Sequence, residues 1–439
     1  MKLLTCSLRV VTIASALIAV LPGCTSRGGQ AFPTVLATSL PCEIALAPLK
    51  GDTTLDLNIA QFQKRARTSK DSIIELERVG WLLVAKARQT LDPGYYKLAQ
   101  ECALCMETRQ PHRAETMLLD GHVLDSLHRF KEAEAVAREL VTLRGLSFDY
   151  GLLGDALMEQ GKLGPAVEAY QRMINQKPTP EAYSRAAHMR WLKGDLPGAI
   201  DLMELAARAN DPADSETSAW VRVKLASYHL QAGNLPHASE LLAAALALEP
   251  GYPPALLAQG RLLLAQGMAG DAVEPLRLAA KSIPSPEYQW ALIEALRAAD
   301  RPVDADAVEA HLLERGGADD PRTFALYLAT TGRSVEAALR IASDELNTRA
   351  DVFTLDTLAW ADAAVGNLPE ARLQSKHALA EGTEDARLFF HAGMISARSQ
   401  QLDDARTWLL KANAIRIMLW PSERAQLAQQ LAALDTSNH

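Results

Sequence analysis

The sequence SFDYGLLGDALMEQGKLGPAVEAYQRMINQKP, at residues 147–178, predicts two short helices joined by a tight turn. Its apolar residues recur every three or four positions, as Leu153 and Leu157 do in the first half, which is the spacing of one helix face. Gly161 suits the positive φ that commonly ends a helix. Because an isolated helix of about 12–15 residues is marginal in water, such a hairpin needs a neighbour on which to bury its apolar face.

The same pattern recurs along most of the chain. With Ala166 as the reference position, alanine also occupies the equivalent position in nine other stretches: Ala99, Ala133, Ala199, Ala238, Ala272, Ala305, Ala337, Ala371 and Ala405. Successive spacings are 34, 33, 33, 39, 34, 33, 32, 34 and 34 residues. A small residue fits there because the axes of packed helices lie only about 8–10 Å apart. The repeat therefore predicts a row of hairpins in which each one covers the next.

Two further positions support the repeat. Five residues before each alanine stand Gly94, His128, Gly161, Gly194, Gly233, Gly267, Asp300, Gly332, Gly366 and Gln400, and proline follows twelve residues after four of the alanines. With these motifs, residues 80–415 resemble the tetratricopeptide repeat family, although His128, Asp300 and Gln400 depart from its turn glycine. The resemblance implies an all-α, right-handed superhelical α-solenoid of about ten helix-turn-helix units.

The N-terminus has the features of an export signal. Residues 1–23 combine Lys2 and Arg9 with an uncharged, mostly apolar run that is too short to span a membrane. The following Leu21-Pro22-Gly23-Cys24 resembles a bacterial lipoprotein cleavage box, although Pro22 is unusual there. This resemblance implies a lipid on Cys24 and a place in the cell envelope, facing the periplasm and held at the outer membrane. The alternative is an ordinary secretory signal that is cut nearby.

The rest of the chain divides into three parts. Residues 24–70, rich in Pro, Gly, Ser and Thr, are predicted to be a flexible tether. Residues 71–415 are predicted to form the solenoid, with an insertion near 211–217 that accounts for the single 39-residue spacing. Residues 416–439 are predicted to form a helix that covers the end of the stack, as terminal units of repeat proteins must, and a tail.

Composition and motifs disfavour several classes of function. The chain has 45 basic and 53 acidic residues, a formal net charge of −8, and no basic stripe with interleaved aromatic residues, so we expect no nucleic-acid partner. The motifs HExxH, GxSxG, GxxxxGK[ST] and GxGxxG do not occur in it. We therefore expect no catalytic residues, no metal site and no cofactor.

Three cysteines remain after the signal and Cys24 are set aside. They are Cys42, Cys102 and Cys105, an odd number for an oxidising compartment. Packed or free thiols are the preferred interpretation. A disulfide, either with Cys42 or within the Cys102–Cys105 pair, and a metal site are the alternatives.

In tetratricopeptide arrays the first helix of each unit lines a concave groove that binds a partner. The resemblance carries this role to Leu118, His122, Asp155, His188, Trp191, Val223, Arg261, Trp290, Glu294, Arg297, Asp356, Trp360, Phe390 and Met394. Trp and Arg are the residue types that dominate binding energetics, which favours a binding role for the three tryptophans. The alternative is that these tryptophans fill gaps between neighbouring units.

We expect a non-catalytic scaffold, anchored by lipid, that binds a segment of another envelope protein in this groove. Similar proteins support the assembly of secretion, pilus or exopolysaccharide-export complexes. A second hypothesis is a periplasmic chaperone or regulatory subunit for one exported enzyme. A third, from a different class, is a thiol or metal site at Cys102 and Cys105.

Overall fold

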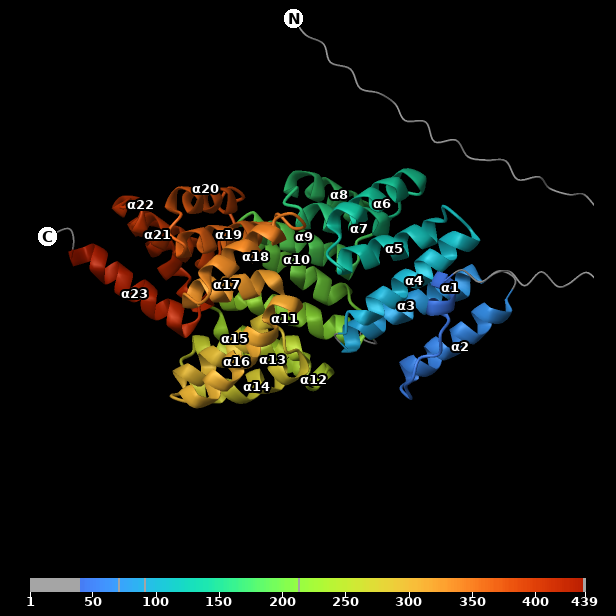
Figure 1. Cartoon of the computed structure of the whole chain (residues 1–439), viewed down its shortest axis with the longest axis horizontal. Coiled ribbons are helices and arrows are strands. Elements are labelled where there is room, and N and C mark those ends of the chain that lie inside the picture. The colour runs from blue at the N-terminus through green and yellow to red at the C-terminus, as the bar shows by residue number, and fades with distance from the viewer. Residues whose placement is uncertain (1–39, 70–71, 91, 212–213, 437–439) are drawn as a thin grey trace, which may run out of the picture. The chain divides into compact units, whose positions relative to one another are not determined.

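The computed structural model describes residues 40–69, 72–90, 92–211 and 214–436, and within these ranges the chain forms helices and no β-strand (Figure 1). The predicted export signal and Cys24 lie outside the described residues. None of the described helices combines the length and the apolar character that crossing a membrane requires.

Ten consecutive helical hairpins make up the body of the protein, which is an all-α superhelical repeat as predicted. Their helices are α3 (Ile73–Thr90), α4 (Gly94–Arg109), α5 (Ala114–Ser126), α6 (Phe130–Leu143), α7 (Ser147–Glu159), α8 (Leu163–Gln176), α9 (Pro180–Leu192), α10 (Leu196–Ala209), α11 (Ser215–Gln231), α12 (Leu235–Leu248), α13 (Pro253–Ala265), α14 (Ala269–Ser282), α15 (Pro286–Ala298), α16 (Pro302–Asp319), α17 (Pro321–Thr331), α18 (Val335–Glu345), α19 (Val352–Ala364), α20 (Leu368–Ala378), α21 (Ala386–Arg398) and α22 (Leu402–Ala414). Each hairpin packs on the next one along the chain.

The small residues of the repeat lie where the two helices of a hairpin approach each other most closely. Nine of the ten reference alanines have no exposed surface. In the eighth hairpin the buried residue is Ala338 rather than the predicted Ala337, which corrects the register there by one position. Gly154 of α7 likewise allows the two helices of its hairpin to approach each other. A Cβ at this position would lie 2.3 Å from the Tyr170 ring, closer than atoms can pack.

The turn inside each hairpin needs one residue in the left-handed conformation. Six of the predicted turn glycines have positive φ, and the non-glycine residues at the same position adopt it too, with φ of 58° at His128, 56° at Asp300 and 60° at Gln400. The backbone geometry of the repeat therefore persists where the glycine is lost. Gly94 is the exception, because it begins α4 instead of forming the turn.

The prediction of a flexible tether is wrong for much of residues 40–69. This segment forms α1 (Leu40–Ala45) and α2 (Thr54–Thr68), and α2 packs on α3. Asp56 stabilises α2 twice, because it completes a capping box with Thr53 and forms a buried ion pair with Lys86 of α3. The Gln63 side chain of α2 also donates to the backbone oxygen of Ala45 at 3.0 Å, and this hydrogen bond joins α2 to α1.

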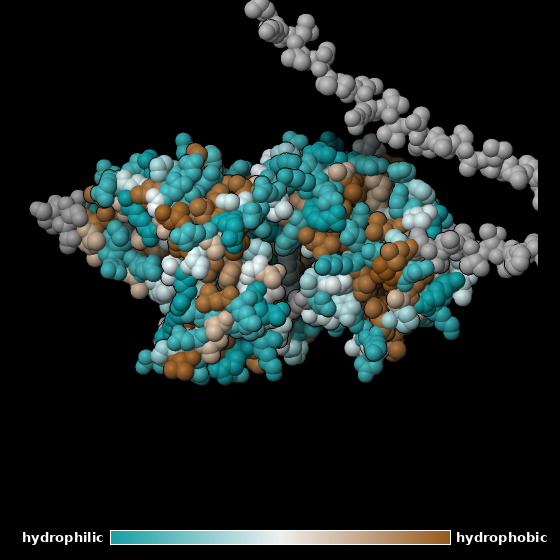
Figure 2. Space-filling model, in the orientation of Figure 1, coloured by the Kyte–Doolittle hydropathy of each residue, from teal (hydrophilic) through white to brown (hydrophobic). Residues whose placement is uncertain are grey.

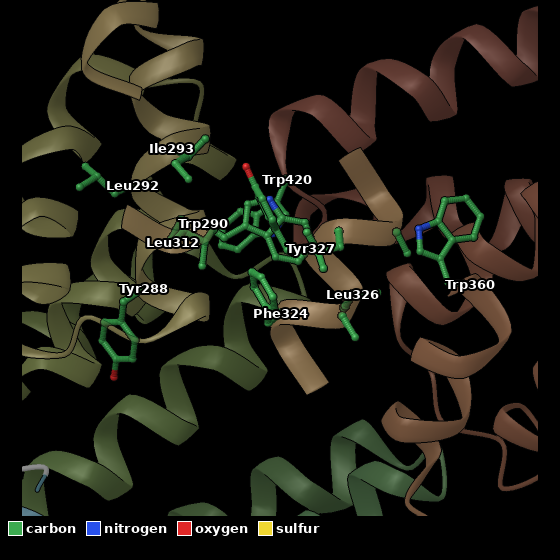
Figure 3. Close-up of a cluster of buried hydrophobic side chains, with 14 of the residues drawn as sticks. Tyr288, Trp290, Leu292, Ile293, Leu312, Phe324, Leu326, Tyr327, Trp360 and Trp420 are labelled. Carbon is green, nitrogen blue, oxygen red and sulfur yellow. The ribbon is translucent and has the colours of Figure 1, made fainter. Parts of the chain in front are cut away.

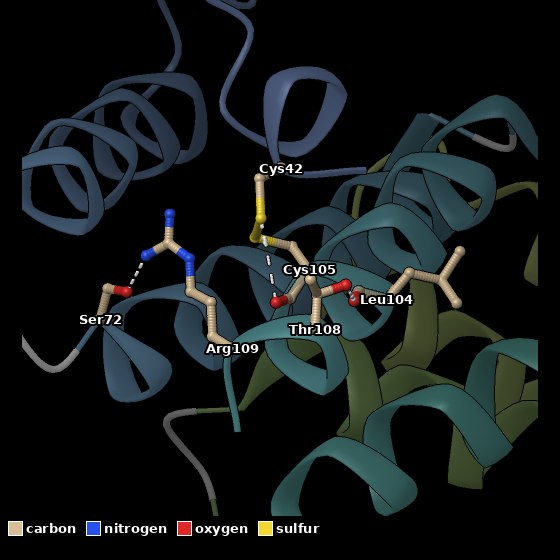
Figure 4. Close-up of a disulfide and its surroundings, with 6 residues drawn as sticks. All are labelled: Cys42, Ser72, Leu104, Cys105, Thr108 and Arg109. Atoms are coloured by element: carbon tan, nitrogen blue, oxygen red, sulfur yellow. Dashed lines mark hydrogen bonds between the residues drawn. A yellow bond between two sulfur atoms is a disulfide. The ribbon is translucent and has the colours of Figure 1, made fainter. Parts of the chain in front are cut away.

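A disulfide joins Cys42 of α1 to Cys105 of α4 (Figure 4). The preferred interpretation of packed or free thiols is therefore wrong for these two residues, and the alternative of a disulfide with Cys42 holds. Cys102 is a buried free thiol, and burial raises its pKa to about 12. Since Cys102 and Cys105 lie on the same helix and only one of them is a thiol, they do not form the redox pair or metal site that the third hypothesis requires.

The insertion at residues 211–217 lengthens a helix as well as a loop. Helix α11 has 17 residues, whereas α7 and α9 have 13. Its N-terminus is capped by Asp214, whose carboxylate accepts from the backbone N–H of Thr217 at 3.0 Å.

The chain ends in η1 (Arg416–Met418) and α23 (Pro421–Thr436). Helix α23 packs on α22, and its Leu427 and Leu434 are buried. This packing is what we expect of a terminal helix that covers the end of the stack. Its first turn also contacts α15, which lies eight helices earlier in the chain (Figure 1).

Two loops late in the chain contact the C-terminal ends of α7, α9 and α11, which lie much earlier in the sequence. The backbone N–H of Ala350 donates to the Glu159 oxygen at 3.0 Å. The Thr383 hydroxyl donates to the Leu192 oxygen at 2.6 Å, and the side chain of Gln231 donates to the Glu384 oxygen at 2.6 Å. Successive turns of the superhelix therefore touch, so part of the inner side is enclosed by the chain itself.

The outer surface carries apolar side chains in patches between hydrophilic ones. Figure 2 shows one such patch over α3 and α4, and the exposed apolar residues of these helices include Ile74 and Leu104.

Candidate functional site

On the concave side of the superhelix, residues of α7, α8 and α9 form an ionic cluster. Asp155 pairs with Arg185 at 2.6 Å and accepts from the Tyr170 hydroxyl at 2.8 Å. Burial acts to lower the pKa of Arg185, but the Asp155 carboxylate outweighs it and raises that pKa. Arg185 therefore keeps its charge, and Asp155 is committed to contacts within its own chain.

Two predicted groove histidines lie near this cluster. The His122 ring lies 5.2 Å from the Trp81 ring, and the His188 ring stacks on Trp191 at 5.5 Å between centroids. Burial lowers the pKa of His122 and of His188 to about 4. Both rings are therefore neutral at pH 7 and offer hydrogen bonds instead of charge.

Trp191 is half-buried, and its contacts come from two turns of the superhelix. Its ring stacks on Phe353 of α19 at 5.8 Å and on Tyr228 of α11 at 6.3 Å. Its indole N–H donates to the Gln231 side chain at 2.7 Å. Trp191 therefore packs against the neighbouring hairpin, which agrees with the alternative of gap filling, and it also joins two turns of the superhelix, which neither alternative included.

Trp290 lies in an aromatic cluster that includes the end of the chain (Figure 3). Its side chain is 2% exposed, and its ring meets Tyr327 edge-on at 5.4 Å and Trp420 at 6.1 Å. The Arg387 guanidinium lies over the Trp290 ring at 5.1 Å. Trp290 is thus a core residue in this structure, and it offers little surface to a partner.

Residues 415–424, which we call the C-terminal segment, cover this part of the concave side. The backbone N–H and the hydroxyl of Ser422 donate to Glu294, at 3.1 and 2.7 Å. Glu423 pairs with Arg387 at 2.7 Å, and the Arg424 side chain donates to the Leu264 oxygen at 2.8 Å. The predicted groove residue Glu294 is therefore occupied by the chain's own C-terminal segment.

Three more of the predicted groove residues, Trp360, Phe390 and Arg297, also contact their own chain. The Trp360 ring is 3% exposed and stacks on His391 at 4.3 Å, and its N–H donates to Thr330 at 3.1 Å. Phe390 has no exposed surface. Arg297 pairs at 2.8 Å with Glu309 of α16, within its own hairpin.

The described residues enclose a hollow on the concave side, and we call it the concave cavity. It has a volume of about 430 Å³ and lies between α11, α13, α15 and the C-terminal segment. The residues that line it are Trp220, Val223, Lys224, Ala226, Ser227, Leu230, Leu242, Pro254, Leu257, Ala258, Arg261, Leu264, Glu287, Tyr288, Ile417, Met418, Leu419 and Trp420. Val223 and Arg261 belong to the predicted groove set, and the others were missed.

Three charged residues line this cavity. Arg261 lies over the Trp420 ring at 4.4 Å and pairs with Glu287 at 3.1 Å. Lys224 lies over the Trp220 ring at 5.8 Å, and no carboxylate of a described residue forms an ion pair with it. Burial lowers the pKa of Lys224, and Glu287 opposes that change. The lysine nevertheless keeps contact with solvent, as expected for a side chain that faces a hollow.

Lys224 could have been found from the sequence, because it stands one position after the predicted groove residue Val223. The contribution of residues 417–420 could not, because the position of the C-terminal segment depends on contacts with helices that are distant in the sequence. In the part of the chain that the structure describes, no group of three His, Cys, Asp or Glu side chains is placed to hold a metal ion.

Residues 152–215 and 223–287 match a family model described as "Tetratricopeptide repeat". No curated protein sequence matches the chain. Similar solved structures include "Crystal structure of APC/C hetero-tetramer Cut9-Hcn1", with 14% identity, a TM-score of 0.42 and coverage of 89% of this chain and 68% of that chain. "Human IFIT1 dimer with PPP-AAAA" has 13% identity, a TM-score of 0.47 and coverage of 86% and 94%. "Functional Characterization of Pseudomonas Aeruginosa pilF" has 14% identity, a TM-score of 0.39 and coverage of 45% and 90%.

Proposed function

We propose, from the tetratricopeptide repeats at residues 152–215 and 223–287, that this protein is a non-catalytic scaffold whose concave side binds a segment of another protein. The observation that carries the proposal is the concave cavity. It is lined mainly by apolar side chains and has a few polar groups at defined positions, the usual composition of a binding pocket. Its volume of about 430 Å³ has room for the anchoring side chains of a bound segment.

The partner in this proposal is another protein of the bacterial cell envelope. The export-signal pattern of residues 1–23 and the lipoprotein-like box at Cys24 support a lipid-anchored protein that faces the periplasm. Disulfides such as Cys42–Cys105 persist in oxidising compartments and are rare in the cytosol. The scaffold would then support the assembly of a secretion, pilus or exopolysaccharide-export complex at the outer membrane.

Replacing Cys24 by serine tests the anchor. Serine cannot carry the thioether-linked lipid, so we expect the variant to move from the membrane fraction to the soluble envelope fraction. Cys6→Ser is the matched control, because it also removes a cysteine from the N-terminal region but leaves the lipoprotein-like box intact. Unchanged fractionation of Cys24→Ser, measured by immunoblotting, would contradict the anchor and leave the binding proposal untouched.

Filling the cavity tests the binding function. Ser227 lines the concave cavity, and its hydroxyl donates only to the Val223 oxygen one helical turn earlier, at 3.0 Å. We expect Ser227→Trp to reduce crosslinked capture of envelope partners by about tenfold or more, because the indole takes the volume that an anchoring side chain needs. The measurement is quantitative mass spectrometry after crosslinking in intact cells.

Ser343→Trp is the matched control for this experiment. Ser343 is also exposed, and its hydroxyl makes the same kind of bond, to the Leu339 oxygen at 2.8 Å, but it does not line the cavity. The control should capture partners as the unmodified protein does. Equal capture by both variants would show that the partner binds elsewhere, and the proposal would then fail.

A further inference from the structure

The concave cavity combines an apolar wall with an unpaired cation. Its apolar lining includes Val223, Leu230, Leu257 and Leu419, which favours apolar side chains in a ligand. The charged lining residues are Lys224, Arg261 and Glu287, so the cavity has one more positive than negative charge. A ligand that matches both features carries apolar groups and one negative charge.

The positions of the charges show where the negative group would go. Glu287 is already paired with Arg261 at 3.1 Å, and Arg261 also stacks on Trp420 at 4.4 Å. Lys224 lies over the Trp220 ring at 5.8 Å from the centroid, and no carboxylate of a described residue forms an ion pair with it. Burial lowers the pKa of Lys224, which reflects the cost of surrounding this ammonium with protein atoms, and Glu287 offsets that cost only in part. An anion beside Lys224 would remove that cost.

The C-terminal segment provides an example of what this part of the concave side binds. It places the Trp420 ring against the Arg261 guanidinium. It also pairs the Glu423 carboxylate with the Arg387 guanidinium at 2.7 Å. Here the negative group is a glutamate within a chain and not a chain terminus. The adjoining cavity is bounded by the same segment and offers the same combination of an apolar surface and a cation.

We infer that the concave cavity binds a peptide segment in which apolar side chains flank a glutamate or aspartate, and that the Lys224 ammonium pairs with this carboxylate. The inference rests on the proposed binding function and specifies the chemistry of the partner. A carboxylate in this position forms a charge-assisted hydrogen bond, which is stronger than a neutral one.

The test measures the binding of defined peptide pools to the full-length protein in lipid nanodiscs. The first pool has 12-residue peptides with both ends blocked and one glutamate among randomised Leu, Phe and Trp. The second pool replaces the glutamate with glutamine. The third pool also has glutamine but a free C-terminal carboxylate, and decanoate serves as a fourth probe. Binding is measured by fluorescence polarisation for the peptides and by calorimetry for decanoate.

We expect the glutamate pool to bind about tenfold or more tightly than the glutamine pool. This preference should disappear in Lys224→Gln and persist in Lys281→Gln. Lys281 is an exposed lysine of α14 outside the cavity, so its variant removes the same charge from another surface. Because both lysines are exposed and neither forms an ion pair among the described residues, the variants should unfold thermally like the unmodified protein.

Four results would overturn the inference. They are equal binding of the glutamate and glutamine pools, a glutamate preference that survives in Lys224→Gln, tighter binding of the pool with the free C-terminal carboxylate, and Lys224-dependent binding of decanoate. The failure of the inference is distinguishable from that of the proposed function. If Ser227→Trp abolishes partner capture while the peptide pools show no preference, the cavity binds a partner of different chemistry.

Discussion

Replacing Arg387 by methionine is expected to lower the free energy of unfolding by about 3–5 kcal/mol, the range seen when one member of a buried ion pair is removed. The partner of Arg387 is Glu423, which has no exposed surface and accepts from the guanidinium at 2.7 Å. Methionine fills much of the same volume but leaves the carboxylate without its counter-charge. The C-terminal segment should therefore detach, which urea denaturation and hydrogen exchange over residues 415–436 would measure.

Arg406→Met is the matched control for this prediction. Arg406 pairs with Asp435 at 2.7 Å, also between the end of the stack and α23, but both side chains are exposed. Exposed ion pairs contribute little to stability, so this variant should unfold much like the unmodified protein. Equal losses in Arg387→Met and Arg406→Met would contradict the structural role of the buried pair. Adding Glu423→Gln to Arg387→Met should recover part of the loss, because it removes the unpaired charge.

The same pair predicts how the attachment of the C-terminal segment depends on pH. Burial acts to raise the pKa of Glu423, but the Arg387 guanidinium outweighs it, so the folded-state pKa lies below the ordinary value of 4.5. A carboxylate with a depressed folded-state pKa contributes stability that is present above its unfolded-state pKa and is lost as the pH falls through the folded value. The difference in stability between the unmodified protein and Arg387→Met should therefore be full at neutral pH and shrink below about pH 4.5.

Removing the disulfide with the double substitution Cys42→Ser and Cys105→Ser is expected to cost about 2–5 kcal/mol. The bond closes a loop across a sequence separation of 63 residues, and without it the unfolded chain gains conformational freedom. It also joins α1 to α4, so the loss should be largest at the N-terminal end. Urea denaturation gives the total loss, and hydrogen exchange should show faster opening of α1 and α2.

Reduction of the unmodified protein is the control. A reductant should lower its stability to that of the double variant, and it should leave the double variant unchanged. If the reductant has no effect on the unmodified protein, the two cysteines are not paired in solution. That result would return Cys42 and Cys105 to the interpretation of packed thiols that the sequence favoured.

Much of the fold was predictable because its signal is local and repeated. The helix spacing, the reference alanine and the turn residue each act within one hairpin of about 34 residues, and ten copies reinforce one another. The error at Ala337, where Ala338 is buried, concerns one position in one copy. The outlines of α23 were also predictable, because its apolar residues follow the spacing of a helix face.

The candidate site was predictable only in part. The sequence assigns residues to the first helix of each hairpin, and Arg261 and Val223 do line the concave cavity. It cannot tell an open groove from one that the chain fills, so Trp290 and Trp360 were proposed as binding residues although they are nearly fully buried.

The sequence by itself determined the repeating hairpins, because each depends on contacts between residues a few helical turns apart. Only the tertiary structure decided which part of the concave side stays open. That outcome depends on contacts such as Trp191 with Phe353 and Ser422 with Glu294, which join residues far apart in the chain. Each of these contacts occurs once and does not repeat along the chain, so the local sequence pattern does not predict it. They form because stacked hairpins curve until distant surfaces meet and bury each other.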